Sequence, residues 1–298
     1  MALNRACVGK EYPPIRTTVT LDAIENYARA CNDDNPCYFD HGNPRAVVAP
    51  PIFGATAMFH SLLAATGDPE AGVDVMRLVH SEQDVEFFRP IRPGDEMVSH
   101  SRIASIETRA TGEAMAIRLT LHNAAGELVQ RAINTIFIRG PRSREAKSSR
   151  TQDGERSRGE PIVNSIQRID PDQAVRYAAA SGDRNPIHLD EGVARMVGLP
   201  GVIIHGLCTM AFVARVIVDG PCGGDPDRLK RMSVRFSRPV HPGVTIETTV
   251  WNGSEANGRK RYLFETRNGA GHVVISDGIA ESIGDDGRSE GVRRLPSA

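Results

Sequence analysis

Residues 177–190 read YAAASGDRNPIHLD, and residues 27–40 read YARACNDDNPCYFD. Seven of these fourteen positions are identical, at a constant spacing of 150 residues. A second match follows in the same order, because VEFFRP at 85–90 and VRFSRP at 234–239 are each followed by a Pro-Gly pair. The repeat is far longer than the roughly 20–50 residues of solenoid units, so each copy is predicted to be a whole domain. The chain is therefore predicted to be an internal duplication of one architecture.

Length and composition agree with two globular domains. The 298 residues are about twice the ~150 residues of an average domain. Hydrophobic residues make up 40% and charged residues 24%, which excludes wholesale disorder and fibrous repeats. The net charge of -1 lacks the basic excess expected of a protein that binds nucleic acid. The most apolar stretch, residues 199–218, contains His205 and Arg215, so we expect a buried helix with its preceding loop and no membrane span.

The cysteines and the N-terminus predict a cytoplasmic protein. Five cysteines are an odd number, and none belongs to a CxxC motif or to a Cys/His cluster at zinc spacing. We expect reduced thiols and no metal site. Residues 1–11 include Arg5, Lys10 and Glu11 and lack the apolar segment of a secretory signal, so export is not expected.

Two polar segments predict the domain boundaries. Residues 140–160, GPRSREAKSSRTQDGERSRGE, contain almost no apolar side chain and cannot build a core. The C-terminal segment has the same character. We therefore expect a first domain over residues 1–140, a flexible linker over 141–160, a second domain over 161–284 and a flexible tail over 285–298.

Each half shows the same order of predicted elements: a short helix, a Pro-rich irregular stretch, an apolar helix and four strands. In the second half Asp170 is predicted to cap the first helix, with Pro171 at its first position and Gln173 completing a capping box, and the helix ends near Gly182. The apolar helix covers residues 203–218. The predicted strands are 232–236, 244–251, 261–267 and 272–280 in the second half, with a hairpin turn at Asn268-Gly269, and 84–88, 97–107, 114–123 and 128–138 in the first. An α+β fold follows, in which a curved sheet surrounds one long helix in each half.

The repeated stretch of the second half also resembles a known family. Residues 177–190, followed by Ala194, Gly198 and IHG at 204–206, are similar to the signature of the MaoC-like (R)-specific enoyl-CoA hydratases and 3-hydroxyacyl-thioester dehydratases. Residues 12–51 are similar to the dehydratase-like N-terminal domain that often accompanies a MaoC domain. The resemblance covers both halves and implies a double hot-dog fold, in which two curved antiparallel sheets, each wrapped around a central helix, pair as a pseudo-dimer.

Hydration of an α,β-unsaturated thioester needs a group that activates water at C3, a proton donor for C2, and N–H groups that hold the enolate oxygen. Asp183 and His188 are the candidate proton-transfer pair, because a Pro-containing turn can bring groups five residues apart onto one water. Asn185 is a candidate to orient one of them. Gly206 stands at the start of the apolar helix, where free N–H groups and the helix dipole favour an oxyanion and a glycine lets a carbonyl approach.

Structural interpretations stand beside these assignments. The run Asp-Arg-Asn-Pro at 183–186 is also ordinary turn chemistry, since Asp and Asn side chains bond their own backbone. His205 fits a structural role, as a helix cap or a partner of a backbone carbonyl, better than direct catalysis. Tyr27 and Tyr177 occupy matched helical positions and are assigned to packing.

The first half is predicted to be catalytically degenerate. At the spacing of 150 residues Asp33 matches Asp183, but Tyr38 takes the place of His188. A tyrosine with its ordinary pKa of about 10 does not cycle a proton near pH 7. We therefore expect one active site per chain, in the second half, with the first half shaping the acyl pocket.

Coenzyme A carries phosphates, so basic residues are expected near the entrance of the site. The candidates for CoA binding are Lys230, Arg231, Arg235 and Arg238. Alternation along a strand places Arg235 on the opposite face from Arg238, so only part of this group can face one ligand. A solvated strand edge is the alternative interpretation.

The hypothesis is a hydro-lyase that reversibly hydrates a trans-2-enoyl-CoA, or an acyl-carrier-protein thioester, to the (R)-3-hydroxyacyl thioester. The resemblance supplies the stereochemistry and implies no metal or redox cofactor, with CoA entering as part of the substrate. The alternatives are an acyl-CoA thioesterase and a noncatalytic subunit that binds acyl thioesters, and the pair Asp183 and His188 argues against both. The acyl chain length, the member of the pair that acts as the base, and a homodimer of such pseudo-dimeric chains are left open.

Overall fold

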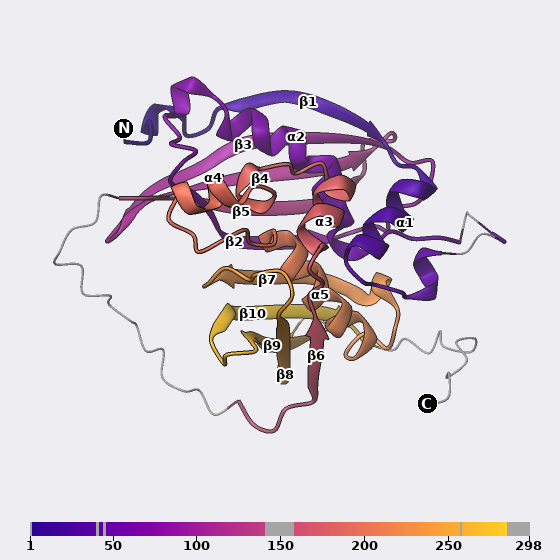
Figure 1. Ribbon diagram of the computed structural model, residues 1–298. Helices are drawn as coiled ribbons and strands as arrows, with labels where there is room; N and C mark the ends of the chain where they lie inside the picture. Colours follow the sequence, from indigo (N-terminus) through magenta and orange to yellow (C-terminus); the bar gives the residue numbers. More distant parts are fainter. Residues whose placement is uncertain (1, 40–41, 44–45, 141–157, 257, 285–298) are drawn as a thin grey trace.

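The computed structural model describes residues 2–39, 42–43, 46–140, 158–256 and 258–284 (Figure 1). Within these residues the strands are β1 (Glu11–Thr18), β2 (Leu78–Phe87), β3 (Glu96–Arg109), β4 (Gly112–Asn123), β5 (Leu128–Arg139), β6 (Val163–Arg168), β7 (Leu229–Phe236), β8 (Thr245–Ala256), β9 (Arg259–Asn268) and β10 (Val273–Ile283). The α-helices are α1 (Leu21–Ala30), α2 (Gly54–Thr66), α3 (Gln173–Ser181), α4 (Glu191–Met196) and α5 (Gly206–Asp219).

One antiparallel sheet runs through both halves of the molecule. Its strand order is β1-β3-β4-β5-β2-β7-β10-β9-β8-β6, so the two halves mirror each other about the β2–β7 pair. β2 and β7 are antiparallel, with Gln83 opposite Val234. Figure 1 shows the two halves on either side of this seam. The α+β double hot-dog expectation is confirmed, and the seam joins the two expected sheets into a single ten-stranded one.

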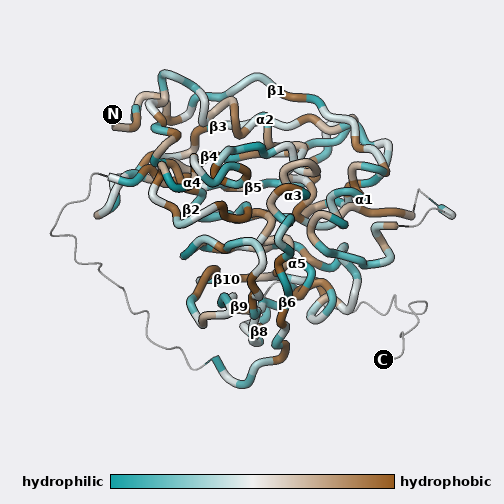
Figure 2. Tube along the Cα trace, in the orientation of Figure 1, coloured by the Kyte–Doolittle hydropathy of each residue, from teal (hydrophilic) through white to brown (hydrophobic). Residues whose placement is uncertain are grey.

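Each half packs one long helix against its part of the sheet. α2 contacts β1, β3 and β4, and α5 contacts β6, β7 and β8. In α5, ten of the fourteen residues are buried, which confirms the predicted core helix. Hydrophobic residues concentrate where the helices meet the sheet (Figure 2). Burial of this apolar surface is the main favourable contribution to the stability of such a domain.

Two tyrosines join the halves at the internal symmetry axis. α1 packs against α3, and the hydroxyls of Tyr27 and Tyr177 lie 3.5 Å apart, with ring centroids separated by 5.6 Å. Both side chains are almost fully buried. The predicted packing role is confirmed, and each hydroxyl gains a polar partner that a buried tyrosine needs.

The first helix of the second half starts later than predicted. α3 begins at Gln173 because the Asp170 carboxylate binds Arg176 at 2.6 Å and Asn32 at 2.9 Å instead of capping the helix. Half of the capping box is present, since the Asp170 N–H donates to Gln173 Oε1 at 3.1 Å. Asn32 belongs to the first half, so the carboxylate is used to hold the halves together. The helix ends as predicted at Gly182, which has φ of 80°.

The central helix of the second half also starts later, at Gly206 rather than at residue 203. The Ile204 N–H donates to the Val240 carbonyl at 2.8 Å, and the Ile203 carbonyl accepts from the His188 ring. These two residues are therefore extended backbone that ties the start of the helix to neighbouring loops.

The eight predicted strands are present, but each half has a fifth strand that was not predicted. β1 contains Pro13 and Pro14, which lie where its pairing with β3 shifts register between Tyr12 and Ile15. β6 alternates half-buried and exposed residues and lacks an apolar run. Both strands are at the edges of the sheet, where a weak hydrophobic pattern is sufficient. The short helix α4 was also not predicted.

The predicted linker over 141–160 lies, up to residue 157, outside the described residues, as does the tail over 285–298. Among the residues that the structure describes, no helix is long and apolar enough to cross a membrane.

Candidate active site

The loop after α3 positions the first candidate carboxylate. Gly182 ends α3 in the left-handed conformation that glycine adopts readily, and the chain then turns through Asp183 to Asn185. Asp183 Oδ1 accepts the Asn185 N–H at 3.1 Å, and Asn185 Oδ1 accepts the Ile187 N–H at 3.3 Å. The turn interpretation of these residues is therefore correct, and Asn185 caps the short 3-10 helix Pro186–His188. The same turn brings the Asp183 carboxylate to the side of the loop where His188 lies.

One ring nitrogen of His188 is hydrogen-bonded to the backbone, and the other is not. The Nδ1–H donates to the Ile203 carbonyl at 2.8 Å, so in the neutral ring Nε2 carries the lone pair. Burial lowers the pKa of His188 below its usual 6.5, while the Ile203 carbonyl and the Asp183 carboxylate act in the opposite direction. A buried, neutral imidazole beside a carboxylate can accept a proton and then stabilise it.

His205 lies between the loop and the start of α5. Its Nε2–H donates to the Asp183 backbone carbonyl at 2.9 Å, and its ring stacks on the His188 ring with centroids 3.7 Å apart and planes at 26°. Burial, followed by the neighbouring His188, lowers the pKa of His205 to about 3. The predicted role as a partner of a backbone carbonyl is confirmed.

Asp183, His188 and His205 therefore converge. One ligand atom from each lies within 4.8 Å of the other two, a spacing that would also suit a metal ion. Each histidine already donates one ring N–H to a backbone carbonyl, which leaves one nitrogen of each ring for other partners. A carboxylate and two imidazoles at this spacing can exchange protons through a bound water.

A second group of metal-ligand type, Cys7, Asp68 and Glu70, lies in the first half. The ammonium group of Lys10 is 2.7 Å from both carboxylates. This amine already neutralises the charge that a cation would need, so the cluster is an ion-pair network.

Gly206 is the first residue of α5 and lies next to this cluster through His205. The N–H groups of the first turn of a helix have no intrahelical acceptor, and the dipole favours negative charge there. A Cβ on Gly206 would lie 3.3 Å from the ring of Phe236 on β7. The Phe236 ring in turn contacts His80 of β2, with centroids 4.9 Å apart. His80 of the first half thus contacts a residue that lies beside Gly206 of the second half. His80 is outside the repeated motifs, so the sequence pattern did not identify it.

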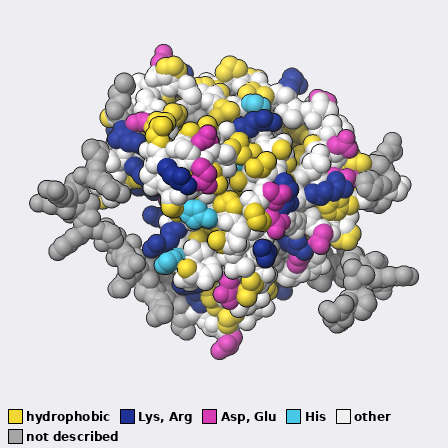
Figure 3. Space-filling model, viewed as in Figure 1, with side chains coloured by type: hydrophobic (Ala, Val, Ile, Leu, Met, Phe, Trp, Pro, Cys, Tyr) yellow, Lys and Arg dark blue, Asp and Glu magenta, His cyan; other side chains and the backbone are white. Residues whose placement is uncertain are grey.

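The four predicted CoA-binding residues have different surroundings. Arg231 binds Asp84 of β2 at 2.9 and 2.6 Å, and Arg235 lies 3.7 Å from Glu82. These pairs cross the seam between the halves. Lys230 lines a small cavity between the two halves, and Arg238 is exposed beyond the end of β7. Acidic and basic side chains are interspersed on the face seen in Figure 3.

The equivalent site of the first half keeps a carboxylate, Asp33, but lacks both imidazoles. Tyr38 replaces His188 and is fully buried, and its hydroxyl has no hydrogen-bond partner among the described residues. Phe53 replaces His205 and contacts Tyr27 edge-on at 5.6 Å, as His205 contacts Tyr177 at 4.9 Å. Burial raises the pKa of Asp33 to about 7. This site has the packing of the second site but not its imidazoles.

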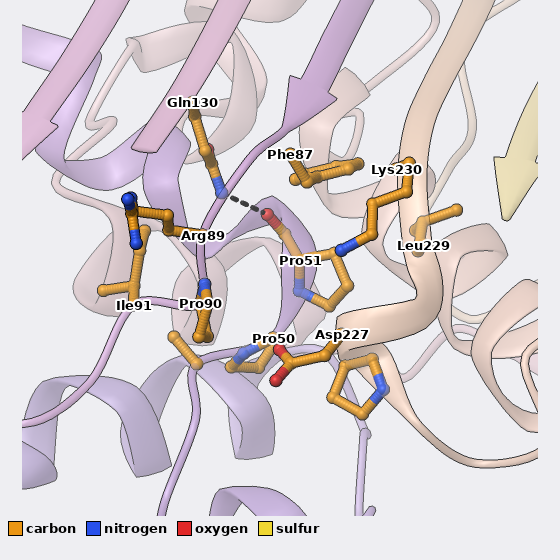
Figure 4. Close-up of a pocket in the computed structure, with 12 residues that line it drawn as sticks. Pro50, Pro51, Phe87, Arg89, Pro90, Ile91, Gln130, Asp227, Leu229 and Lys230 are labelled. Carbon is orange, nitrogen blue, oxygen red and sulfur yellow. Dashed lines mark hydrogen bonds between the residues drawn. The ribbon is translucent and has the colours of Figure 1, made fainter. Parts of the chain in front are cut away.

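Gln130 packs against Gly54, the first-half counterpart of the predicted oxyanion residue Gly206. Gly54 begins α2 as Gly206 begins α5, and the amide of Gln130 lies so close to Gly54 that a Cβ there would collide with it. The Gln130 amide donates to the Pro51 carbonyl at 3.1 Å (Figure 4). Gln130 is paired with Phe87 on β2, whereas the residue paired with the equivalent Phe236 is Ile275. The Gln130 amide therefore packs against the first glycine of the central helix in the first half, whereas the apolar ring of Phe236 packs against it in the second half.

Solved structures share this architecture. A crystal structure of a MaoC-like dehydratase from Phytophthora capsici superposes with a TM-score of 0.78 and 26% identity, over 95% of this chain and 100% of that chain. A Mycobacterium tuberculosis protein described as a double hotdog fold superposes with a TM-score of 0.62 over 93% of this chain and 96% of that chain. At 14% identity the second likeness concerns the fold alone.

Sequence relatives agree with the structures. Residues 151–274 match the MaoC like domain, and residues 6–132 match the FAS1-like, dehydratase domain region. The chain is 31% identical over 218 residues to the probable enoyl-CoA hydratase 2 of Dictyostelium discoideum, with 70% of each protein covered. It is 29% identical over 244 residues to 3-hydroxyacyl-thioester dehydratase Y of Mycobacterium tuberculosis, with 80% of each covered. The chain therefore belongs to the MaoC-like dehydratase family, as a relative of enoyl-CoA hydratase 2.

Proposed function

We propose that the protein catalyses the reversible hydration of a trans-2-enoyl-CoA to the (R)-3-hydroxyacyl-CoA, with the chemistry carried by Asp183 and His188. The observation that supports this assignment is the convergence of these two groups next to the N-terminus of α5. The names of two relatives of this chain, enoyl-CoA hydratase 2 and 3-hydroxyacyl-thioester dehydratase, describe the same reaction in its two directions.

In the hydration direction a water molecule is held by the Asp183 carboxylate and His188 Nε2. The imidazole accepts one water proton as the oxygen bonds to C3, and the π electrons move to the thioester oxygen as an enolate. The Gly206 N–H and the α5 dipole stabilise this oxyanion. The imidazolium then returns the proton to C2 on the same face, so H and OH are added and no other reactant is needed. Dehydration is the reverse sequence.

The electrostatics of the pair support His188 as the group that carries the proton. In its resting state the ring is neutral because burial disfavours the cation. When it is protonated, the adjacent Asp183 carboxylate stabilises the charge. Because the two groups are proposed to act on the same water, removal of either should impair hydration and dehydration alike.

One assay separates this proposal from its alternatives. The protein is incubated with crotonyl-CoA, and the loss of the conjugated-enoyl absorbance and the release of free thiol are followed together. Enoyl loss without thiol release is the expected result. Thiol release without enoyl loss would instead identify a thioesterase, and neither change over a panel of chain lengths would favour a noncatalytic acyl-thioester-binding subunit.

The remaining features of the proposal concern the substrate carrier and the cofactors. The proposed carrier is CoA, and Arg238 at the exposed end of β7 contacts its phosphates. The alternative carrier is acyl carrier protein. The reaction as written uses protein side chains and water, with no metal or redox cofactor. Comparison of kcat/KM for crotonyl-CoA and for the crotonyl carrier-protein thioester tests which carrier is preferred. Retention of activity after treatment with a chelator tests whether the reaction proceeds without a metal.

Assembly and cellular location also belong to the proposal. One chain already contains both halves of a hot-dog pair, so a homodimer would join two complete sites. Light scattering of the purified protein measures this state. The free cysteines, most of them buried, support a reducing compartment such as the cytoplasm, and fractionation of cells that express the protein tests the location.

A further inference from the structure

We infer that His205 is a positioning residue of the reaction proposed above: it sets the geometry of Asp183 and His188 without contacting the substrate. It makes one contact with each of the two groups. Its Nε2–H donates to the Asp183 backbone carbonyl at 2.9 Å, and its ring face covers the His188 ring at 3.7 Å.

The hydrogen bond joins two elements that are otherwise separate at this point. Asp183 lies on the loop that follows α3, whereas His205 is the residue immediately before α5. The backbone of Asp183, from which its carboxylate projects, is therefore held in position relative to Gly206, which follows His205 in the chain. The stack of the His205 ring on the His188 ring orients the second group of the pair. It restricts rotation of the His188 ring about the Nδ1–H bond to the Ile203 carbonyl.

Packing alone does not account for a histidine at this position. His205 is 2% exposed, and its Nδ1 has no hydrogen-bond partner among the described residues. A buried polar atom without a partner costs free energy, so an apolar ring would be more stable there. The first half contains that apolar ring: Phe53 occupies the equivalent place before α2 and packs on Tyr27. The duplicated fold keeps the imidazole in the half that also keeps Asp183 and His188.

The variant His205→Phe tests the inference because the first half shows that the fold accommodates this ring. We expect kcat for crotonyl-CoA to fall about 10- to 100-fold, as expected for misplaced catalytic groups, with KM within about threefold. The acid limb of the kcat profile should move to lower pH. The reason is that the Asp183 carboxylate raises the pKa of His188, and this effect weakens when the carboxylate is no longer held beside it. His205→Gln, which keeps an N–H donor, should recover part of kcat.

Phe53→His is the matched control. It introduces the same ring at the equivalent place in the half that lacks His188, and kcat and the pH profile should equal those of the unmodified protein. A His205→Phe protein with unchanged kcat would overturn the inference. A loss of kcat with an unchanged pH profile and a lower melting temperature would also overturn it, because that combination describes a purely structural residue.

A measurement without substrate keeps this inference separate from the proposed reaction. The pKa of His188 is measured by NMR titration in four full-length proteins: unmodified, Asp183→Asn, His205→Phe and the double variant. Asp183→Asn should lower the His188 pKa in the unmodified background and have a much smaller effect when residue 205 is Phe. Equal effects in both backgrounds would overturn the inference. Absence of turnover in the unmodified protein would refute the proposed reaction and leave this result unaffected.

Discussion

Gln130 lies directly against Gly54, and its amide, which donates to the Pro51 carbonyl, occupies the space that a Cβ at residue 54 would need. The two glycines begin matched central helices, but one faces a buried amide and the other faces the edge of Phe236. One glycine therefore packs against a polar amide and the other against an apolar ring. This difference, together with the loss of the imidazole at Tyr38, explains why a duplicated chain is expected to have one active site.

The glycines themselves provide the first prediction. Gly206→Ala should lower kcat by about 10²–10³, because the new Cβ blocks the approach of the oxyanion to the helix N-terminus. Its unfolding free energy should change by no more than about 1 kcal/mol, since the helix propensity gained by alanine offsets the small shift that Phe236, 3.3 Å from the new Cβ, must make. Steady-state kinetics and urea denaturation measure the two effects.

Gly54→Ala is the matched variant and should show the reverse result. Its Cβ collides with Gln130, so unfolding should become easier by about 1–3 kcal/mol while kcat is retained. Gln130→Ala in the same chain should relieve the collision. A large loss of kcat in Gly54→Ala would contradict the assignment of one site to the second half.

The proton-transfer pair provides the second prediction. Asp183→Asn and His188→Ala should each lower kcat by about two to four powers of ten, because each removes a group that moves or stabilises the proton. The double variant should lose little more than either single one, since the groups act as a unit. Tyr38→Phe changes the equivalent position of the first half and should keep full activity. If Tyr38→Phe abolished turnover in a folded protein, the first half would not be catalytically degenerate.

Asp33 provides a prediction about stability and pH. Burial raises the pKa of this carboxyl from 3.8 to about 7, so between these values the folded protein binds a proton that the unfolded chain has released. Stability is therefore lost as the pH rises through this range. Asp33→Asn should be more stable than the unmodified protein by about 1–3 kcal/mol at pH 8 and equally stable near pH 4. Urea denaturation at both pH values checks the sign, and an advantage at pH 4 that vanished at pH 8 would contradict it.

The basic residues of β7 provide the fourth prediction. Arg231→Gln should lower the unfolding free energy by about 0.5–1 kcal/mol, because its ion pair with Asp84 crosses the seam and is about one-third exposed. It should leave KM for crotonyl-CoA unchanged. Arg238→Gln should raise that KM and have a smaller effect on the KM of the N-acetylcysteamine thioester, which lacks the nucleotide phosphates. A raised KM in Arg231→Gln would restore Arg231 as a CoA ligand.

The positions of the catalytic groups were predictable from sequence because a local turn creates most of their geometry. Asp183, Asn185 and His188 lie within six consecutive residues, and side chains within the turn bind its own backbone. The helix that begins at Gly206 was also local information, although its start was placed three residues early. The sequence left the role of the basic residues open, because the ion pair of Arg231 is made with Asp84, which lies 147 residues away on another strand.

The amino-acid sequence by itself determined the duplication, the core helix of each half and the asymmetry between His188 and Tyr38, since these depend on residue identity and short-range periodicity. Only the tertiary structure decided that the two sheets merge at the β2–β7 seam, that His80 reaches Phe236, and that Gln130 closes the first-half site. The same holds for the stack of His205 on His188. These contacts join residues 17 to 156 positions apart, and their distances follow from how the strands and helices pack rather than from any local pattern.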